Sequence, residues 1–204
     1  MRPNIAQDAP PTEISVGGIS YPVNVDFRVW LDVLQKFREI SGDFENPQAL
    51  VHDIAILAEI QRMVFGHCIP DADFVDVLHA VLEFSEGYPS APKSETGGSG
   101  ESGPQTVSFN YDLNYIILAI RNQSGIDLTY RRTEPFHWWE FLLEYQTLCG
   151  DHYILNLIEA RSYKGKDKDL LRRKRACALP VERTAAEQAE IDAFNALFEG
   201  GNNE

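Results

Sequence analysis

The chain has 204 residues, of which 44% are apolar and 11% aromatic, so it carries enough apolar surface for a buried core and is not disordered throughout. Its net charge of −13 at pH 7 disfavours binding of the whole molecule to nucleic acid or to an anionic membrane, because like charges repel. The three cysteines are widely spaced and lack a CxxC pair, which argues against a disulfide framework or a zinc ribbon and predicts reduced thiols in the core.

The beginning of the chain predicts a tail and a β-hairpin. Residues 1–11 contain three prolines and little to bury, which predicts a disordered tail. The segment EISVGGISYPVNV follows, and its Gly17-Gly18 pair supplies the positive φ angles of a tight hairpin turn. There is no apolar signal region, and no run approaches the ~18 apolar residues of a membrane span, so we expect a cytoplasmic protein without membrane contact.

The first helix is predicted directly after the hairpin. Asp26 is a favourable N-cap for the segment FRVWLDVLQKFREI. Apolar residues recur there at intervals of three and four and form one stripe, which includes Trp30 and Phe37. We expect both side chains in the core and an end to the helix at Gly42.

Two more helices complete a predicted lobe of residues 12–88. Asn46 and Pro47 form a cap followed by a proline at the first helical position, and the helical pattern then runs to Gly66. The third helix is predicted to begin near Asp71 and has one inward apolar face. After this lobe, residues 89–106 are rich in serine, glycine and proline and predict a flexible linker. A coil of this length reaches roughly 20 to 25 Å, so the two halves either pack on each other or separate.

A second helical lobe is predicted over residues 107–178. Its first helix follows Asn110, has an apolar stripe that includes Ile117, and stops at Gly125. Thr133 and Pro135 are predicted to open the next helix, which contains the sequence HWW.

The HWW helix has two apolar faces. Trp138, Phe141 and Tyr145 share one face, with the spacing of a core-facing stripe. A second face carries Phe136, Trp139 and Leu143. Burial of each large side chain contributes about 1.5 to 3 kcal/mol, so leaving this face in water would forfeit several kcal/mol. Either other helices of the chain or a partner must therefore cover it. These three residues are our candidate partner-contact face, and intramolecular burial is the alternative.

The position of His137 beside two tryptophans raises the possibility of a catalytic base. No GxSxG motif, cysteine–histidine pair or carboxylate dyad accompanies it, and the nearest carboxylates that precede it in sequence are Asp127 and Glu134. We therefore predict a packed histidine. We also predict no catalytic residues, no metal site and no cofactor, so the protein is not expected to be an enzyme.

The segment from residue 161 to residue 175 has the sharpest charge asymmetry in the chain. Eight positive and two negative side chains give it a local charge of +6 within a chain of −13. Arg161 continues the apolar stripe of the preceding helix, so we predict that it snorkels or forms a buried ion pair with a neighbouring helix. The remaining charges predict either a solvated helix facing acidic neighbours or, less in keeping with the global charge, a nucleic-acid contact.

The end of the chain predicts an acidic neighbour for that basic segment. Residues 179–199 predict an amphipathic helix, and residues 200–204 a frayed tail. The helix has acidic residues along one side and, on the other, the apolar residues Ile191, Phe194, Leu197 and Phe198. The fold class that emerges is mainly α: a helical bundle of about six or seven helices with a short N-terminal β-hairpin and a flexible internal linker.

Three blocks of sequence occur together: VGGISYPVNVDFRVWL, FNYDLNYIILAIRNQSGIDL, and HWWEFLLEYQTL followed by Arg161. Together they resemble a family of proteins from temperate phages and prophages of Gram-positive bacteria, known by the phage gene-product number fifteen. The resemblance covers roughly residues 12–180 and is strongest over Val25–Leu31, Tyr111–Leu128 and His137–Phe141. The glycine- and serine-rich segment and the run Arg172–Arg175 are less typical of the family.

The resemblance implies a role in tail assembly and brings no catalytic residues. Genes of this family typically lie beside the gene of the tape measure protein, in a region where small acidic helical proteins act as tail assembly chaperones. We therefore expect a chaperone that binds the tape measure protein in the host cytoplasm, with a second tail assembly chaperone or the tail-tube protein as a further candidate partner. The alternatives are a structural tail component retained in the virion, or a nucleic-acid-binding accessory protein that uses residues 161–175.

Overall fold

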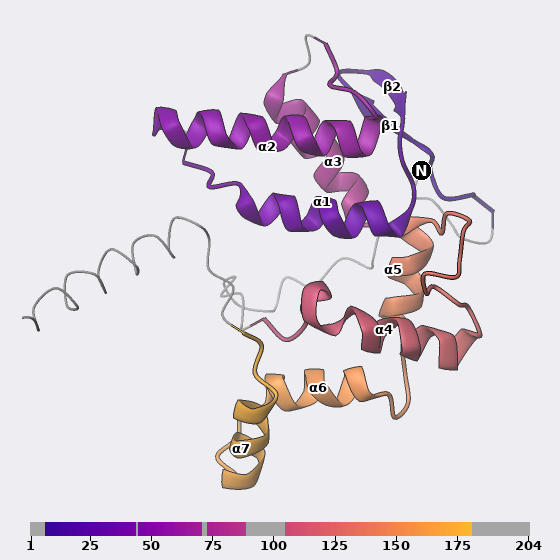
Figure 1. Cartoon of the computed structure of the whole chain (residues 1–204), viewed down its shortest axis with the longest axis vertical. Coiled ribbons are helices and arrows are strands. Elements are labelled where there is room, and N and C mark those ends of the chain that lie inside the picture. Colours follow the sequence, from indigo (N-terminus) through magenta and orange to yellow (C-terminus); the bar gives the residue numbers. More distant parts are fainter. Residues whose placement is uncertain (1–6, 44, 71–72, 89–104, 181–204) are drawn as a thin grey trace, which may run out of the picture.

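The computed structural model describes residues 7–43, 45–70, 73–88 and 105–180 (Figure 1). Within these residues it has seven helices and one two-stranded sheet. The prediction of a mainly helical chain with an N-terminal hairpin is therefore confirmed. Residues 1–6 of the predicted tail, residues 89–104 of the predicted linker and residues 181–204 lie outside the described residues.

The hairpin consists of β1 (Glu13–Val16) and β2 (Ile19–Pro22), which pair antiparallel with Ile14 opposite Tyr21. Gly17 and Gly18 form the turn at φ angles of 57° and 83°, which non-glycine residues rarely adopt. Alternation along β1 buries Ile14 and Val16, and β1 packs against helix α3.

Three helices complete the first half: α1 (Phe27–Glu39), α2 (Pro47–Phe65) and α3 (Phe74–Ser85). Each has a side-chain N-cap, provided by Asp26, Asn46 and Asp73. The start predicted for α3 near Asp71 was wrong by a few residues, because the carboxylate of Asp73 accepts the backbone N–H of Val75 and so sets the first turn.

Helix α1 ends at Glu39, earlier than the predicted stop at Gly42. The buried carboxylate of Asp53, in α2, accepts hydrogen bonds from the backbone N–H and the hydroxyl of Ser41 and from the N–H of Gly42, at 2.9 to 3.0 Å. Burial opposes ionisation of Asp53, but these hydrogen bonds outweigh it and hold the pKa of the carboxyl below its ordinary value. The loop after α1 is thereby fastened to α2.

The second half contains α4 (Phe109–Ser124), α5 (Trp138–Gln146), α6 (Tyr153–Ser162) and α7 (Lys168–Ala176). Gly125 ends α4 at a φ of 76°, at the predicted position. The HWW helix α5 begins at Trp138, so its predicted opening at Thr133 and Pro135 was wrong.

Helix α5 joins the two halves. In Figure 1 the hairpin and α1 to α3 lie together on one side, α4, α6 and α7 lie on the other, and α5 stands between them. It packs against both α1 and α4, and its residues Trp138, Trp139 and Phe141 are buried. The sequence left open whether the two halves pack on each other or separate. In the structure they pack on each other.

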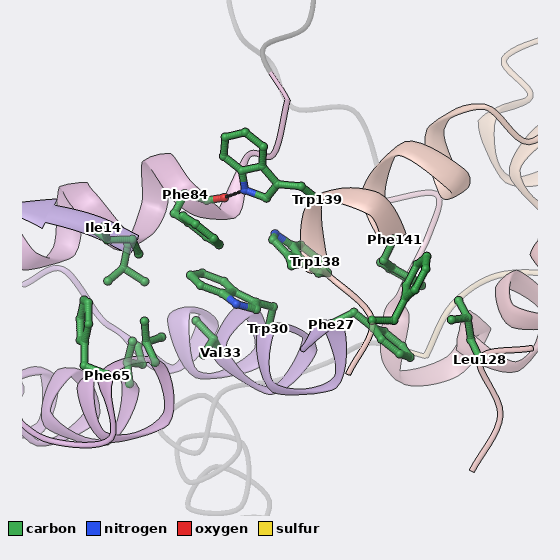
Figure 2. Close-up of a cluster of buried hydrophobic side chains, with 14 of the residues drawn as sticks. Ile14, Phe27, Trp30, Val33, Phe65, Phe84, Leu128, Trp138, Trp139 and Phe141 are labelled. Atoms are coloured by element: carbon green, nitrogen blue, oxygen red, sulfur yellow. Dashed lines mark hydrogen bonds between the residues drawn. The ribbon is translucent and has the colours of Figure 1, made fainter. Parts of the chain in front are cut away.

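The core follows this junction. Of the predicted core residues, Trp30, Trp138 and Phe141 are 0% exposed, and their rings lie near Phe27 in Figure 2. The other three predicted core residues are partly buried and pack around the same cluster: Phe37, Ile117 and Tyr145.

The cysteines do not follow the prediction of core thiols. Cys68 and Cys149 are exposed, and Cys177 is partly buried. Cys68 and Cys149 lie in short connections beside Gly66 and Gly150, both at positive φ, where the chain turns at the surface.

Candidate functional site

The HWW sequence lies where two helices begin side by side. Asp26 and His137, the N-caps of α1 and α5, form an antiparallel bridge. The N–H of Phe27 donates to the carbonyl of Phe136 at 2.9 Å, and the N–H of Trp138 donates to the carbonyl of Val25 at 2.7 Å. This pairing fixes the entry of both helices relative to each other.

Both ring nitrogens of His137 are bound to backbone. Nδ1 accepts the N–H of Trp139 at 3.0 Å, which caps α5, and Nε2 lies 2.9 Å from the carbonyl oxygen of Pro11. An acceptor at Nδ1 and a donor at Nε2 require the neutral imidazole with its proton on Nε2. Burial lowers the pKa of His137, and the hydrogen bond to Pro11 and the charge of Glu140 oppose it only in part. The geometry leaves neither nitrogen open toward solvent, which fits the predicted packed histidine.

The two indoles bind the end of another helix. Nε1 of Trp138 donates to the carbonyl of Ser85 at 2.9 Å, and Nε1 of Trp139 donates to the carbonyl of Phe84 at 2.8 Å, the bond drawn in Figure 2. Ser85 and Phe84 are the last two residues of α3, where carbonyls lack partners within the helix. The HWW sequence therefore caps the start of α5 with its histidine and the end of α3 with its tryptophans.

The candidate partner-contact face needs correction at two of its three residues. Phe136 is 9% exposed and Trp139 is 7% exposed, so neither forms an open contact face. The Trp139 ring packs on Phe84 and Tyr88, with ring centroids 5.5 and 5.0 Å away. Of the two alternatives for these side chains, intramolecular burial is the one the structure has.

The third residue of that face lies beside the N-terminal segment. Leu143 is partly buried and, with Tyr88 and Glu140, lines a surface groove against residues 7–10. Since Pro11 also accepts the hydrogen bond from His137, the described end of the predicted tail lies along α5.

Arg161 forms a buried ion pair with Asp112 of α4. Its two terminal nitrogens bind the two carboxylate oxygens at 2.6 and 3.0 Å, and the side chains are 9% and 1% exposed. The guanidinium also donates to the carbonyls of Thr106 and Cys177, and Asp112 accepts the N–H of Ser108. This pair fastens the start of α4, the end of α6 and the chain after α7 to one another.

An ion pair was one of the two roles predicted for Arg161, but its partner Asp112 was not predicted. A usable signal was present, because Asp112 lies on the same helical face as the buried Ile116, Ala119 and Ile120. A carboxylate on an inward face requires a buried partner.

An apolar surface that was not predicted from the sequence lies on α4 and α6. Tyr111, Tyr115 and Leu118 recur at intervals of four and three along α4 and are 40 to 49% exposed. Tyr153, the first residue of α6, is 59% exposed, and its ring contacts that of Tyr115 with centroids 4.8 Å apart. We call these four residues the tyrosine patch. The signal for it was an apolar pattern on the side of α4 opposite the predicted stripe.

The described residues show neither a metal cluster nor a spanning helix. Within residues 7–43, 45–70, 73–88 and 105–180, no group of three or more His, Cys, Asp or Glu side chains is placed to hold a metal ion. None of the described helices is long and apolar enough to cross a membrane.

These features define a mainly helical protein in which an aromatic junction and a buried ion pair hold two groups of helices together. The chain belongs to the family described as Bacteriophage Gp15 protein, whose model matches residues 7–178. The resemblance inferred from the three sequence blocks is thus confirmed, and the matched range contains all seven described helices. Neither a curated protein nor a solved structure matches the chain.

Proposed function

We propose that this phage protein is a tail assembly chaperone that binds the tape measure protein in the host cytoplasm and catalyses no reaction. The observation that carries the proposal is the family match over residues 7–178, which makes the chain a phage protein. A mainly helical molecule with a net charge of −13 is suited to holding amphipathic helices of a partner whose polar side is basic.

The tyrosine patch supports a specific binding surface for such a helix. Its four large side chains come from two packed helices, and the spacing of Tyr111, Tyr115 and Leu118 gives a continuous strip along α4. A partner helix whose apolar residues recur every three or four positions would cover that strip. Tyrosine suits such a site, since its ring supplies apolar area while its hydroxyl stays hydrogen-bonded to water.

A co-expression experiment tests both the partner and the surface. The tape measure protein encoded in the same phage or prophage is expressed alone, with the chain, and with the double variant Tyr115→Ser and Tyr153→Ser. We expect the chain to keep the tape measure protein in the supernatant after centrifugation and to co-purify with it. Loss of two contacts worth about 1 kcal/mol each should weaken binding at least about tenfold.

Tyr130→Ser is the matched control, because Tyr130 is 88% exposed and lies outside the tyrosine patch. This variant should bind like the unaltered chain. If the unaltered chain fails to bind the tape measure protein, the chaperone proposal fails. If the unaltered chain and the double variant bind the tape measure protein equally well, the tape measure protein is still the partner but the tyrosine patch is not the binding surface.

Mass spectrometry of purified virions separates the chaperone from a structural tail component. A chaperone leaves when the tail-tube subunits polymerise around the tape measure protein, so its peptides should be absent from finished particles. Peptides at a constant ratio to the tail-tube protein would instead assign the chain to the virion.

A further inference from the structure

Helix α7 presents an exposed basic surface. It has no buried residue, and Arg172, Arg173 and Arg175 are all exposed. In Figure 1 it lies at the end of the molecule opposite the hairpin. Three consecutive positive side chains, Arg173, Lys174 and Arg175, occupy its last turn. The rest of the chain is strongly acidic, so this helix is the natural binding surface for an anionic group.

The carboxylates closest in sequence, Asp167 and Asp169, form no ion pair with this surface within the described residues. No ion pair is formed in that part of the chain by Arg172, Arg173 or Arg175. The carboxylate of Asp167 accepts the N–H groups of Asp169 and Leu170 at 2.9 and 3.1 Å, so it caps α7. Lys174 donates to the carbonyl of Tyr163 and not to a carboxylate.

We propose that the basic surface of α7 binds the acidic segment 182–199 of the same chain. That segment carries five acidic side chains and one arginine, with the acids at Glu182, Glu187, Glu190, Asp192 and Glu199. Its charge is opposite to that of α7, and the exposed Leu170 offers an apolar contact for its apolar side. The partner is therefore intramolecular.

Only a short tether separates α7 from the start of this segment. The carbonyl of Cys177 accepts a hydrogen bond from Nε of Arg161 at 2.6 Å, which holds the chain just after the helix ends. Glu182 follows five residues later. A segment tethered this closely has an effective concentration in the millimolar range, which a separate polyanion at micromolar concentration cannot match. A nucleic acid must in addition approach a chain of charge −13.

A zero-length cross-linking experiment on the full chain tests the contact directly. Carbodiimide joins a lysine to a carboxylate only when the two touch, and mass spectrometry identifies the pair. We expect cross-links from Lys168 or Lys174 to the acids of segment 182–199. They should be independent of protein concentration and should weaken as NaCl is raised, because the contact is electrostatic. Absence of these cross-links, or their growth with protein concentration, would overturn the proposal.

Charge neutralisation in the full chain gives a second test. The variant Glu187→Gln, Glu190→Gln, Asp192→Asn should bind a fluorescein-labelled DNA duplex at least about threefold more tightly than the control Glu13→Gln, Asp76→Asn, Glu83→Gln, because only the first releases α7 and neither adds a positive charge. The control residues are exposed and lie in the first half, and both variants reach the same net charge. Equal DNA affinities would contradict the proposal. So would tight DNA binding by the unaltered chain, which would assign α7 to nucleic acid. Neither test depends on the tape measure protein.

Discussion

The imidazole of His137 fastens two backbone segments that are 126 positions apart in the chain. It accepts the N–H of Trp139 and donates to the carbonyl of Pro11. A protonated ring has no acceptor nitrogen and cannot cap α5. Protonation of His137 is therefore coupled to folding, so the stability of this protein depends on pH.

The first prediction concerns that link. The pKa of His137 is lowered in the folded state and lies near 6.5 in the unfolded chain. The unfolded state therefore binds the proton more readily, so the free energy of unfolding is highest above pH 6.5 and falls as the pH drops toward the folded pKa. Urea unfolding between pH 5 and pH 8 should show this slope. His137→Asn keeps a capping oxygen and should remove the slope, while losing about 1 kcal/mol with the bond to Pro11.

His79→Asn is the control for this measurement. His79 is exposed on α3, so its replacement should leave the slope unchanged. A slope that persists in His137→Asn would assign the pH dependence to other groups.

At the scale of the elements, the helix interiors were predictable and several of their starts were not. Apolar residues at intervals of three and four mark α1, α2 and α4, and Gly66 and Gly125 end their helices as predicted. The start of α5 was missed because histidine is an uncommon N-cap, whereas threonine is a common N-cap and proline is common at the first helical position.

The candidate site was less predictable than the helices. Burial of Trp139 depends on the carbonyl of Phe84, which lies 55 positions away and becomes available only where α3 ends. A single helical pattern distinguishes two apolar faces but does not say which one another helix covers. For the same reason, the sequence did not identify Asp112 as the partner of Arg161, and it did not predict that the tyrosine patch is exposed.

The second prediction concerns the contact between the end of α3 and α5. Gly87 has a φ of 79°, and a Cβ there would lie 2.7 Å from Cδ1 of Leu142. Gly125 has a similar φ of 76° and open space around it, so it is the matched control. Both alanine variants lose about 1 to 2 kcal/mol from the left-handed backbone, and Gly87→Ala should lose about 0.5 to 1.5 kcal/mol more, because the end of the Leu142 side chain must leave its rotamer. Urea unfolding measures the difference.

A double variant identifies the cause. Adding Leu142→Ala removes the obstructing side chain, so Gly87→Ala should cost less in that background than in the unaltered chain. Equal costs in both backgrounds would mean that backbone strain alone accounts for the loss.

At the scale of the whole molecule, the two halves depend on each other through α5. The Trp30 and Trp138 rings stack with centroids 6.3 Å apart, and Phe27 stacks on Phe141 at 4.8 Å. All four side chains are almost completely buried, and each contributes about 1.5 to 3 kcal/mol when its apolar surface leaves water. Without α4 and α5, the first half would expose Phe27 and Trp30 to solvent.

The third prediction follows from this shared core. A protease site placed between residues 91 and 100, in the predicted linker, allows the chain to be cut after folding. The two fragments should elute together in size-exclusion chromatography and unfold in a single transition, because the contacts of α5 with α1 and α3 do not require a continuous chain.

In the cut protein, Trp138→Ala should cost about 3 to 5 kcal/mol and separate the fragments at micromolar concentration. Tyr130→Ser, at an exposed position, should leave them associated. Fragments that separate without any substitution, or that unfold in two transitions, would show that each half folds independently and that the aromatic junction contributes little to the stability of the whole.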